Sequence, residues 1–196
     1  MTTLNLRALY ACNMVASKED TRYYLNGVYT HVIETGAPEC PKQRIYVATD
    51  GHRLLKLVTL PNQDDNGEAL IIPSHAIVKV KDCNEGILTV STIKNEYDIE
   101  SQRAELTYGD NTIVFVPVYG VYPDYVRAIP SKDPEATTEI GVNATALQSI
   151  EKAVRYYRGY SSKQALAMPL EFRGASEPIK INFNHGETGV LMPMRA

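Results

Sequence analysis

The stretch RIYVATDGHRLLKLVTL, residues 44–60, is the part of the sequence that decides the fold. Two apolar runs, Ile45–Ala48 and Leu54–Leu60, flank the short reversal Thr49-Asp50-Gly51. An Asp-Gly pair between alternating apolar residues is a strong hairpin signal, because glycine adopts positive φ without steric cost. A histidine and an arginine follow the turn at the start of the second run. The stretch therefore predicts a β-hairpin whose polar residues line one end of a sheet.

The composition is that of an ordinary globular protein. The chain has 196 residues, 44% hydrophobic and 22% charged, and a chain of this length buries about 70% of its unfolded surface. The sequence contains no run of 18 apolar residues that would predict a membrane span, and no signal peptide is evident. We therefore expect a cytoplasmic protein. Cys12, Cys40 and Cys83 form no CxxC pair, which argues against a metal site. With a net charge of −3, any nucleic-acid contact must come from a local basic face.

A strand, a helix and about three further strands recur three times along the chain. Helices are expected over 4–17, 74–82 and 143–158, with Asn5, Ser74 and Asn143 as N-caps. Their starts are separated by about 69 residues, which indicates a repeat architecture. Residues 131–138, SKDPEATT, are polar and contain proline, so they predict a linker between the second and third rounds.

The expected strands are apolar or alternating runs bounded by turn residues. They lie at 25–34, 45–48, 54–60, 70–73, 87–93, 103–108, 112–119, 139–142, 166–172, 179–183 and 188–192.

Four short segments carry a resemblance to a known family. They read TRYYLNG from residue 21, VATDGHRL from residue 47, YPDY from residue 122 with Arg127 and Pro130 behind it, and MPMR from residue 192. Together and in this order they resemble the bacterial DNA polymerase III beta subunit, the sliding clamp. Residues 1–130 resemble its middle domain, with two repeats, and residues 139–196 resemble the second half of its last domain.

The resemblance implies an α+β DNA-clamp fold, with helices lining one side and antiparallel sheets outside. Family chains hold three domains of two repeats each, and two chains close a ring of twelve repeats. This chain holds three repeats, as in a shortened phage- or mobile-element-type version. Four copies would restore twelve repeats, so we expect a homotetrameric ring.

The resemblance also implies a groove for short peptides between the middle and last domains. Carried over onto this sequence, its wall consists of Leu25, Thr49, Gly51, His52, Arg53, Leu54, Pro123, Arg127, Val190, Met192, Pro193, Met194 and Arg195. Leucine, methionine, proline and valine make an adaptable apolar slot for leucine or phenylalanine side chains. The arginines can hydrogen-bond the peptide backbone or carboxylates. Without the resemblance, ordinary strand packing would explain the two methionines.

The DNA-facing side is expected on the helices, with one cationic stripe on each. Arg7 and Lys18 share a face if the first helix reaches residue 18, and His75 and Lys79 are four residues apart on the second. The expected DNA-facing residues are Arg7, Lys18, Tyr23, Tyr24, His75, Lys79, Lys152, Arg155 and Arg158. A solvated surface is the alternative explanation of these cations.

The function that these observations favour is that of a processivity factor in DNA replication. The chain would encircle double-stranded DNA without sequence preference and tether DNA polymerase and other proteins with clamp-binding motifs. We expect that it is not an enzyme and that it uses no cofactor, metal or membrane contact. A truncated clamp-like regulator, which binds clamp-binding peptides without encircling DNA, is the alternative. Acid–base chemistry by Asp50 and His52 is a third hypothesis, although no nucleophile, metal set or phosphate loop accompanies them.

Overall fold

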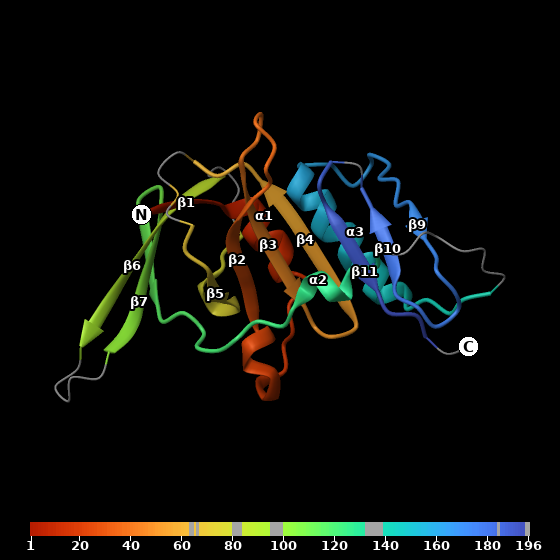
Figure 1. Ribbon diagram of the computed structural model, residues 1–196, viewed down its shortest axis with the longest axis horizontal. Helices are drawn as coiled ribbons and strands as arrows, with labels where there is room; N and C mark the ends of the chain where they lie inside the picture. The colour runs from red at the N-terminus through yellow and green to blue at the C-terminus, as the bar shows by residue number, and fades with distance from the viewer. Residues whose placement is uncertain are drawn as a thin grey trace.

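The computed structural model describes residues 1–62, 65, 67–79, 84–94, 100–131, 139–183 and 185–194. The chain forms an α+β fold of two antiparallel sheets (Figure 1). The larger sheet has the order β5-β2-β3-β4-β11-β10-β9 and the smaller sheet the order β1-β6-β7-β8. The smaller sheet lies at one end of the long axis of the molecule, and β9 lies at the other end.

The larger sheet combines strands from the two ends of the chain. Its members are β5 (Leu70–Pro73), β2 (Gly27–Glu34), β3 (Lys42–Thr49), β4 (Arg53–Thr59), β11 (Thr188–Leu191), β10 (Ile179–Asn182) and β9 (Leu170–Glu171). The smaller sheet contains β1 (Thr2–Asn5), β6 (Glu85–Lys94), β7 (Glu100–Tyr108) and β8 (Asn111–Phe115). Each of the first two repeats therefore gives its leading strand to the other repeat's sheet, because β1 pairs with β6 and β5 pairs with β2. This exchange joins the two repeats into one unit.

Two helices pack against the sheets in a shared core. They are α1 (Leu6–Asn13) and α3 (Ala144–Arg158), which lie against each other and bury Leu9, Ile150 and Val154 with residues of both sheets. The opposite face of the larger sheet is covered by the segment that contains the short helix α2 (Tyr125–Ala128), as Figure 1 shows in front of β3 and β4. No helix in the described residues is long and apolar enough to cross a membrane.

The strongest local signals of the sequence are confirmed. Thr49 pairs with Leu54 across the predicted hairpin, and Gly51 has a φ of +90° at its turn. The side chain of Asn5 accepts a hydrogen bond from the backbone N–H of Ala8 at 2.9 Å, and Asn143 caps α3 in the same way. These caps satisfy backbone donors that the first turn of a helix leaves unpaired.

The helix expected over 74–82 is wrong within the described residues. Ser74–Ala76 forms a single 3₁₀ turn (η2), Ser74 makes no capping hydrogen bond, and Ile77 is extended. Residues 80–82 lie outside the described residues. The β-branched pair Ile77 and Val78 disfavours a helix, and Ile77 instead packs into the main core.

Several predicted boundaries also change. The helix α1 ends at Asn13, so Lys18 follows in a loop and shares no helix face with Arg7. The strand expected over 139–142 is reduced to a bridge between Gly141 and Met194. The strand predictions over 112–119 and 166–172 are shortened to β8 and β9. Pro117 lacks the N–H that would extend β8, and most of the predicted linker, 132–138, is outside the described residues.

Candidate functional site

The candidate groove is built on the seam where β4 pairs with β11. Leu54 lies opposite Val190 and Leu55 lies opposite Gly189, so the sheet runs continuously from the first repeat into the third. Beyond the paired strands, the backbone N–H of Met192 donates to the carbonyl oxygen of His52 at 2.9 Å. The seam thereby brings the hairpin turn next to the last strand of the chain.

The hairpin turn is organised by Asp50. Its Oδ1 accepts hydrogen bonds from the backbone N–H groups of His52 (2.9 Å) and Arg53 (3.0 Å), and its Oδ2 lies 3.0 Å from Arg53 Nε. The Thr49 hydroxyl donates to the carbonyl oxygen of Arg53 at 2.7 Å. The Asp50 carboxylate is therefore used by the turn and by Arg53, which gives no support to the acid–base hypothesis for Asp50 and His52.

Arg53 also crosses the seam. One of its terminal nitrogens donates to the hydroxyl of Ser149 on α3 at 2.5 Å, and that hydroxyl donates in turn to the carbonyl oxygen of Ala146. The Arg53 side chain is 19% exposed. It connects the first repeat to the third, in addition to lying beside the groove. Sequence reasoning missed Ser149, because a serine in the middle of a helix has no distinctive signal until its partner is placed.

Most of the predicted groove residues form a buried floor or an exposed rim, while Thr49, Arg53 and Pro193 are half-buried. Leu25, Leu54 and Val190 are buried in one apolar cluster on the outer face of the larger sheet. Met192 and Met194 are 40% and 53% exposed. The other exposed rim residues are Gly51, His52, Pro123 and Arg127, while Arg195 lies outside the described residues. At the seam, Leu54 of the floor lies opposite Val190, and Met192 of the rim is hydrogen-bonded to His52.

An aromatic stack holds the segment of α2 on the sheet. Tyr29 stacks on Tyr122 and on His31, each with ring centroids 5.0 Å apart, and His31 Nε2 lies 2.9 Å from the Tyr125 hydroxyl. Burial lowers the pKa of His31 and raises the pKa of Tyr122. The stack leaves Arg127 at the rim, where its side chain is 89% exposed and pairs with Asp124 at 3.0 Å.

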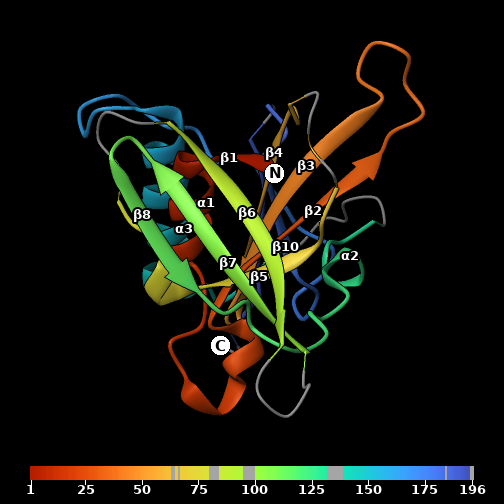
Figure 2. The ribbon, with the colours of Figure 1, turned by 90° about the vertical axis from the view of Figure 1, so that its left-hand side faces the viewer.

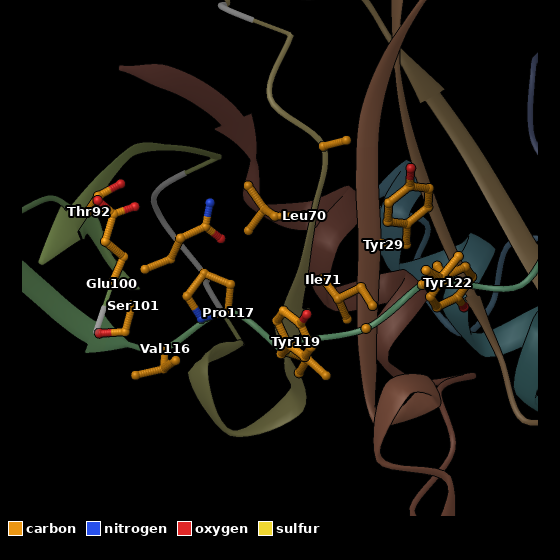
Figure 3. Close-up of a pocket in the computed structure, with 15 residues that line it drawn as sticks. Tyr29, Leu70, Ile71, Thr92, Glu100, Ser101, Val116, Pro117, Tyr119 and Tyr122 are labelled. Atoms are coloured by element: carbon orange, nitrogen blue, oxygen red, sulfur yellow. The ribbon is translucent and has the colours of Figure 1, made fainter. Parts of the chain in front are cut away.

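A separate cleft of about 760 Å³ lies beside this stack (Figure 3). Residues 116–122 run along it, between Tyr29 and Tyr122 at one end and Thr92, Glu100 and Ser101 at the other. None of the twelve predicted groove residues that the structure describes lines this cleft. The cleft and the candidate groove are therefore different surfaces that meet at Tyr122.

Two of the expected DNA-facing cations gather around one tyrosine of α3. Arg7 donates to the carbonyl oxygen of Tyr156 at 2.7 Å and lies 5.4 Å from the centre of its ring. Lys79 lies 5.9 Å from the centre of the same ring. Arg7 is half-buried, whereas Lys79 is exposed. Lys152 is exposed, and its ammonium group contacts Gln148 at 3.2 Å.

The other two cations of the α3 stripe are used inside the third repeat. Arg155 pairs with Glu151 and donates to the carbonyl oxygens of Ser161 and Gln164. Arg158 donates to Glu187 at 2.9 and 3.0 Å and to the carbonyl oxygen of Phe183 at 2.6 Å. The hydrogen bonds that Arg158 donates to the Glu187 carboxylate raise the pKa of Arg158. Spacing alone could not show these partners.

The remaining expected DNA-facing residues lie away from the helices. Lys18 is exposed in the loop after α1, and Tyr23 and Tyr24 belong to the 3₁₀ segment η1 (Asp20–Leu25). Their rings make an edge-to-face pair with centroids 5.7 Å apart. His75 shares a hollow with Tyr23. The expected helical pairing of His75 with Lys79 is wrong, because η2 ends at Ala76.

Comparison with known proteins decides the family. The family model of the DNA polymerase III beta subunit, central domain, matches residues 3–124. The chain belongs to the DNA polymerase III beta subunit family. The beta sliding clamp of Caulobacter vibrioides is 30% identical over 134 residues, which cover 68% of this chain and 34% of that protein. The beta sliding clamp of Escherichia coli K12 is 27% identical over 190 residues, covering 92% and 49%.

Solved structures of beta subunits share the fold. The Caulobacter crescentus beta sliding clamp superposes on the whole chain with a TM-score of 0.72 at 18% identity, over 65% of that clamp. A sliding clamp from Bartonella birtlesii bound to griselimycin has a TM-score of 0.66 at 21% identity, over 99% of this chain and 65% of that clamp. The α+β clamp fold is thereby confirmed.

The chain is shorter than these beta subunits. It spans between about a third and a half of the curated relatives it matches. Sliding clamps are processivity factors without catalytic activity, so family membership agrees with the expectation that the chain is no enzyme.

Proposed function

We propose that the chain is a DNA sliding clamp that encircles duplex DNA and tethers DNA polymerase and other partners through a peptide groove at the seam of β4 and β11. The observation that carries the proposal is the hydrogen bond from Met192 to His52, at the end of a continuous sheet. It holds two separate segments of the predicted groove side by side.

The groove has the chemistry that a short apolar peptide requires. Methionine side chains adapt to different partners because they are unbranched and polarisable. Met192 and Met194 present such side chains above a floor of Leu25, Leu54 and Val190. The guanidinium group of Arg127 can exchange its partner Asp124 for a peptide carboxylate or carbonyl, because an exposed ion pair contributes little free energy of stabilisation.

Contact with DNA would rest on phosphate-binding cations and would carry no sequence preference. Lys152 and Lys18 are exposed and therefore available for phosphate contact. Arg155 and Arg158 make intramolecular contacts, so the DNA-facing role predicted for them competes with a structural one. A double variant, Lys18→Glu/Lys152→Glu, should lower retention on circular DNA and reduce its salt dependence.

Ring closure would need four copies of this chain. Its complete two-repeat unit, residues 1–130, is followed by a single repeat, 139–196, which can complete a second unit only with the equivalent repeat of another copy. A two-fold interface of this kind uses the same surface twice. Four chains then supply twelve repeats, as in a family ring, whereas two chains supply six.

The test of the groove is peptide binding to a truncated chain. Deletion of residues 192–196 should weaken binding of a short leucine- and phenylalanine-containing clamp-binding peptide by about 2–4 kcal/mol, the range for losing a group of anchor residues. Tyr119→Ala is the matched control, because Tyr119 is 93% exposed but lines the separate cleft. Unchanged affinity in a folded truncated chain would contradict the proposal. Peptide binding without retention on circular DNA would favour the clamp-like regulator instead.

A further inference from the structure

Among the residues that the structure describes, the outer side of β8 is an open sheet edge. Figure 2 shows β8 as the outermost strand of the smaller sheet. Within the described part of the chain, β8 pairs with β7 and no backbone hydrogen bond joins its other side to a further strand. The strand reads NTIVF, with no charge and no proline, and Val114 is 50% exposed. Natural proteins usually protect such edges, because an open row of backbone groups pairs with any suitable strand.

The edges of the larger sheet carry such protection. β9 has only two residues, and its Glu171 pairs with Arg173 at 2.8 Å and contacts Lys180. β5 ends with Pro73, and the backbone N–H of Val118 donates to the carbonyl oxygen of Ile71 at 3.0 Å. β8 is longer than either strand, and it contains neither the charged residue of β9 nor the proline of β5.

The seam described above shows how such an edge is covered in this molecule. β4 and β11 are each the last strand of a repeat, and they pair antiparallel with each other. β8 is the last strand of the second repeat and therefore has the equivalent position. Because β4 and β11 already pair with each other, neither of these last strands is left to cover β8.

We propose that β8 pairs antiparallel with β8 of a second copy of this chain, across a two-fold axis perpendicular to the sheet. The second copy is the occupant that the seam favours, because it offers the one last strand that is equally uncovered. The joint extends the smaller sheet from four strands to eight. The joint would also be one of the contacts that close the proposed ring, and in that respect it rests on the proposed function. The pairing itself can be measured without DNA or peptide.

The two faces of β8 restrict the register. Phe115 is buried and Ile113 packs against the same core, whereas Thr112 and Val114 are exposed on the opposite face. Residues directly opposite in an antiparallel pair point to the same face. Placing Ile113 on the two-fold axis pairs all of β8 and sets Thr112 opposite Val114 of the second copy.

This register brings no like charges together. Around the axis the exposed face presents Thr112 and Val114 of each copy, and Thr112 already shares a hydroxyl contact of 3.1 Å with Thr107. The carboxylate in the β7–β8 turn, Asp110, lies at opposite ends of the joint in the two copies. The contact is therefore an uncharged pairing of β-branched residues, which suits a strand interface.

Two charge variants test both the joint and its register by native mass spectrometry at micromolar concentration. In Thr112→Lys/Val114→Lys, introduced ammonium groups face each other across the axis, so the dissociation constant of the joint should rise about tenfold or more. In Thr112→Glu/Val114→Lys, each carboxylate faces an ammonium group, so association should be restored. Both sites are exposed, so equal urea midpoints of the dissociated chains provide the folding control.

The joint is supported if the wild-type protein has a mass of four times 21.8 kDa and the double-lysine variant forms only dimers or monomers. A wild-type dimer that becomes monomeric in this variant also supports the joint and overturns the ring of four. A monomeric wild-type chain, or assembly unaffected by the two lysines, overturns the joint. Equal dissociation of the two charge variants overturns the register. Peptide affinity reports on the groove separately, since β8 contributes none of its residues.

Discussion

Arg158 offers the clearest quantitative test of the structure, because the sequence and the structure assign it different roles. Its spacing with Lys152 and Arg155 predicts a DNA-facing stripe, whereas its guanidinium group is bound to Glu187 and to the carbonyl oxygen of Phe183. The Glu187 side chain is only 3% exposed and that of Arg158 only 14%. Removing one partner of such a pair leaves an uncompensated buried charge.

Arg158→Ala should therefore lower the free energy of unfolding by about 3–5 kcal/mol. Lys152→Ala, on the exposed face of the same helix, should change it by no more than about 0.5 kcal/mol. In Arg158→Met/Glu187→Met both charges are replaced by apolar side chains of similar length, and most of the lost stability should return. Urea unfolding at one fixed protein concentration measures all three variants, because assembly makes stability concentration-dependent.

A loss of less than about 1 kcal/mol in Arg158→Ala would refute this reasoning. If that variant also lost retention on circular DNA, Arg158 would belong to the DNA-facing surface after all. If stability falls as expected while Lys152→Ala alone weakens DNA retention, the two cations have the separate roles that their exposure indicates.

Three further perturbations address the strand pairing, the seam and the aromatic stack. A Cβ added to Gly27 would lie 2.4 Å from the carbonyl oxygen of Ile72, so Gly27→Ala should cost about 1–3 kcal/mol in urea unfolding. Ser149→Ala removes the acceptor of Arg53 across the seam and should cost about 1 kcal/mol by the same measurement. Burial lowers the pKa of His31, so below about pH 6.5 the unfolded chain binds a proton that the folded chain does not. The free energy of unfolding should therefore fall as the pH drops below that value, and it should fall less in His31→Gln.

The features predicted correctly from the sequence are those with local physical causes. The Asp-Gly turn and the caps at Asn5 and Asn143 each act within a few residues, so a short stretch contains the whole signal. The helix predicted from Ser74 is wrong because the β-branched residues Ile77 and Val78 disfavour a helix, and Ile77 is extended in the structure.

Contacts between distant residues account for the rest. Arg158 binds Glu187, and Arg53 binds Ser149 from another repeat, so neither partner could be read from helical spacing. The structure places His52 and Leu54 beside Val190 and Met192, and all four belong to the groove that the resemblance implies. Only the resemblance suggested that these residues lie near one another, because the pairing of β4 with β11 is not a local property of the chain.

The position of the seam has a consequence for how the proposed activities depend on protein concentration. Both strands of the seam, β4 and β11, belong to one chain, so a single copy contains the floor and the described rim of the groove. Peptide affinity per chain should therefore be the same above and below the concentration at which copies associate. Encirclement of DNA requires closed joints between copies, and each joint obeys mass action. Retention on circular DNA should consequently disappear on dilution while peptide binding persists, and the same separation should appear in any variant that weakens the pairing of β8.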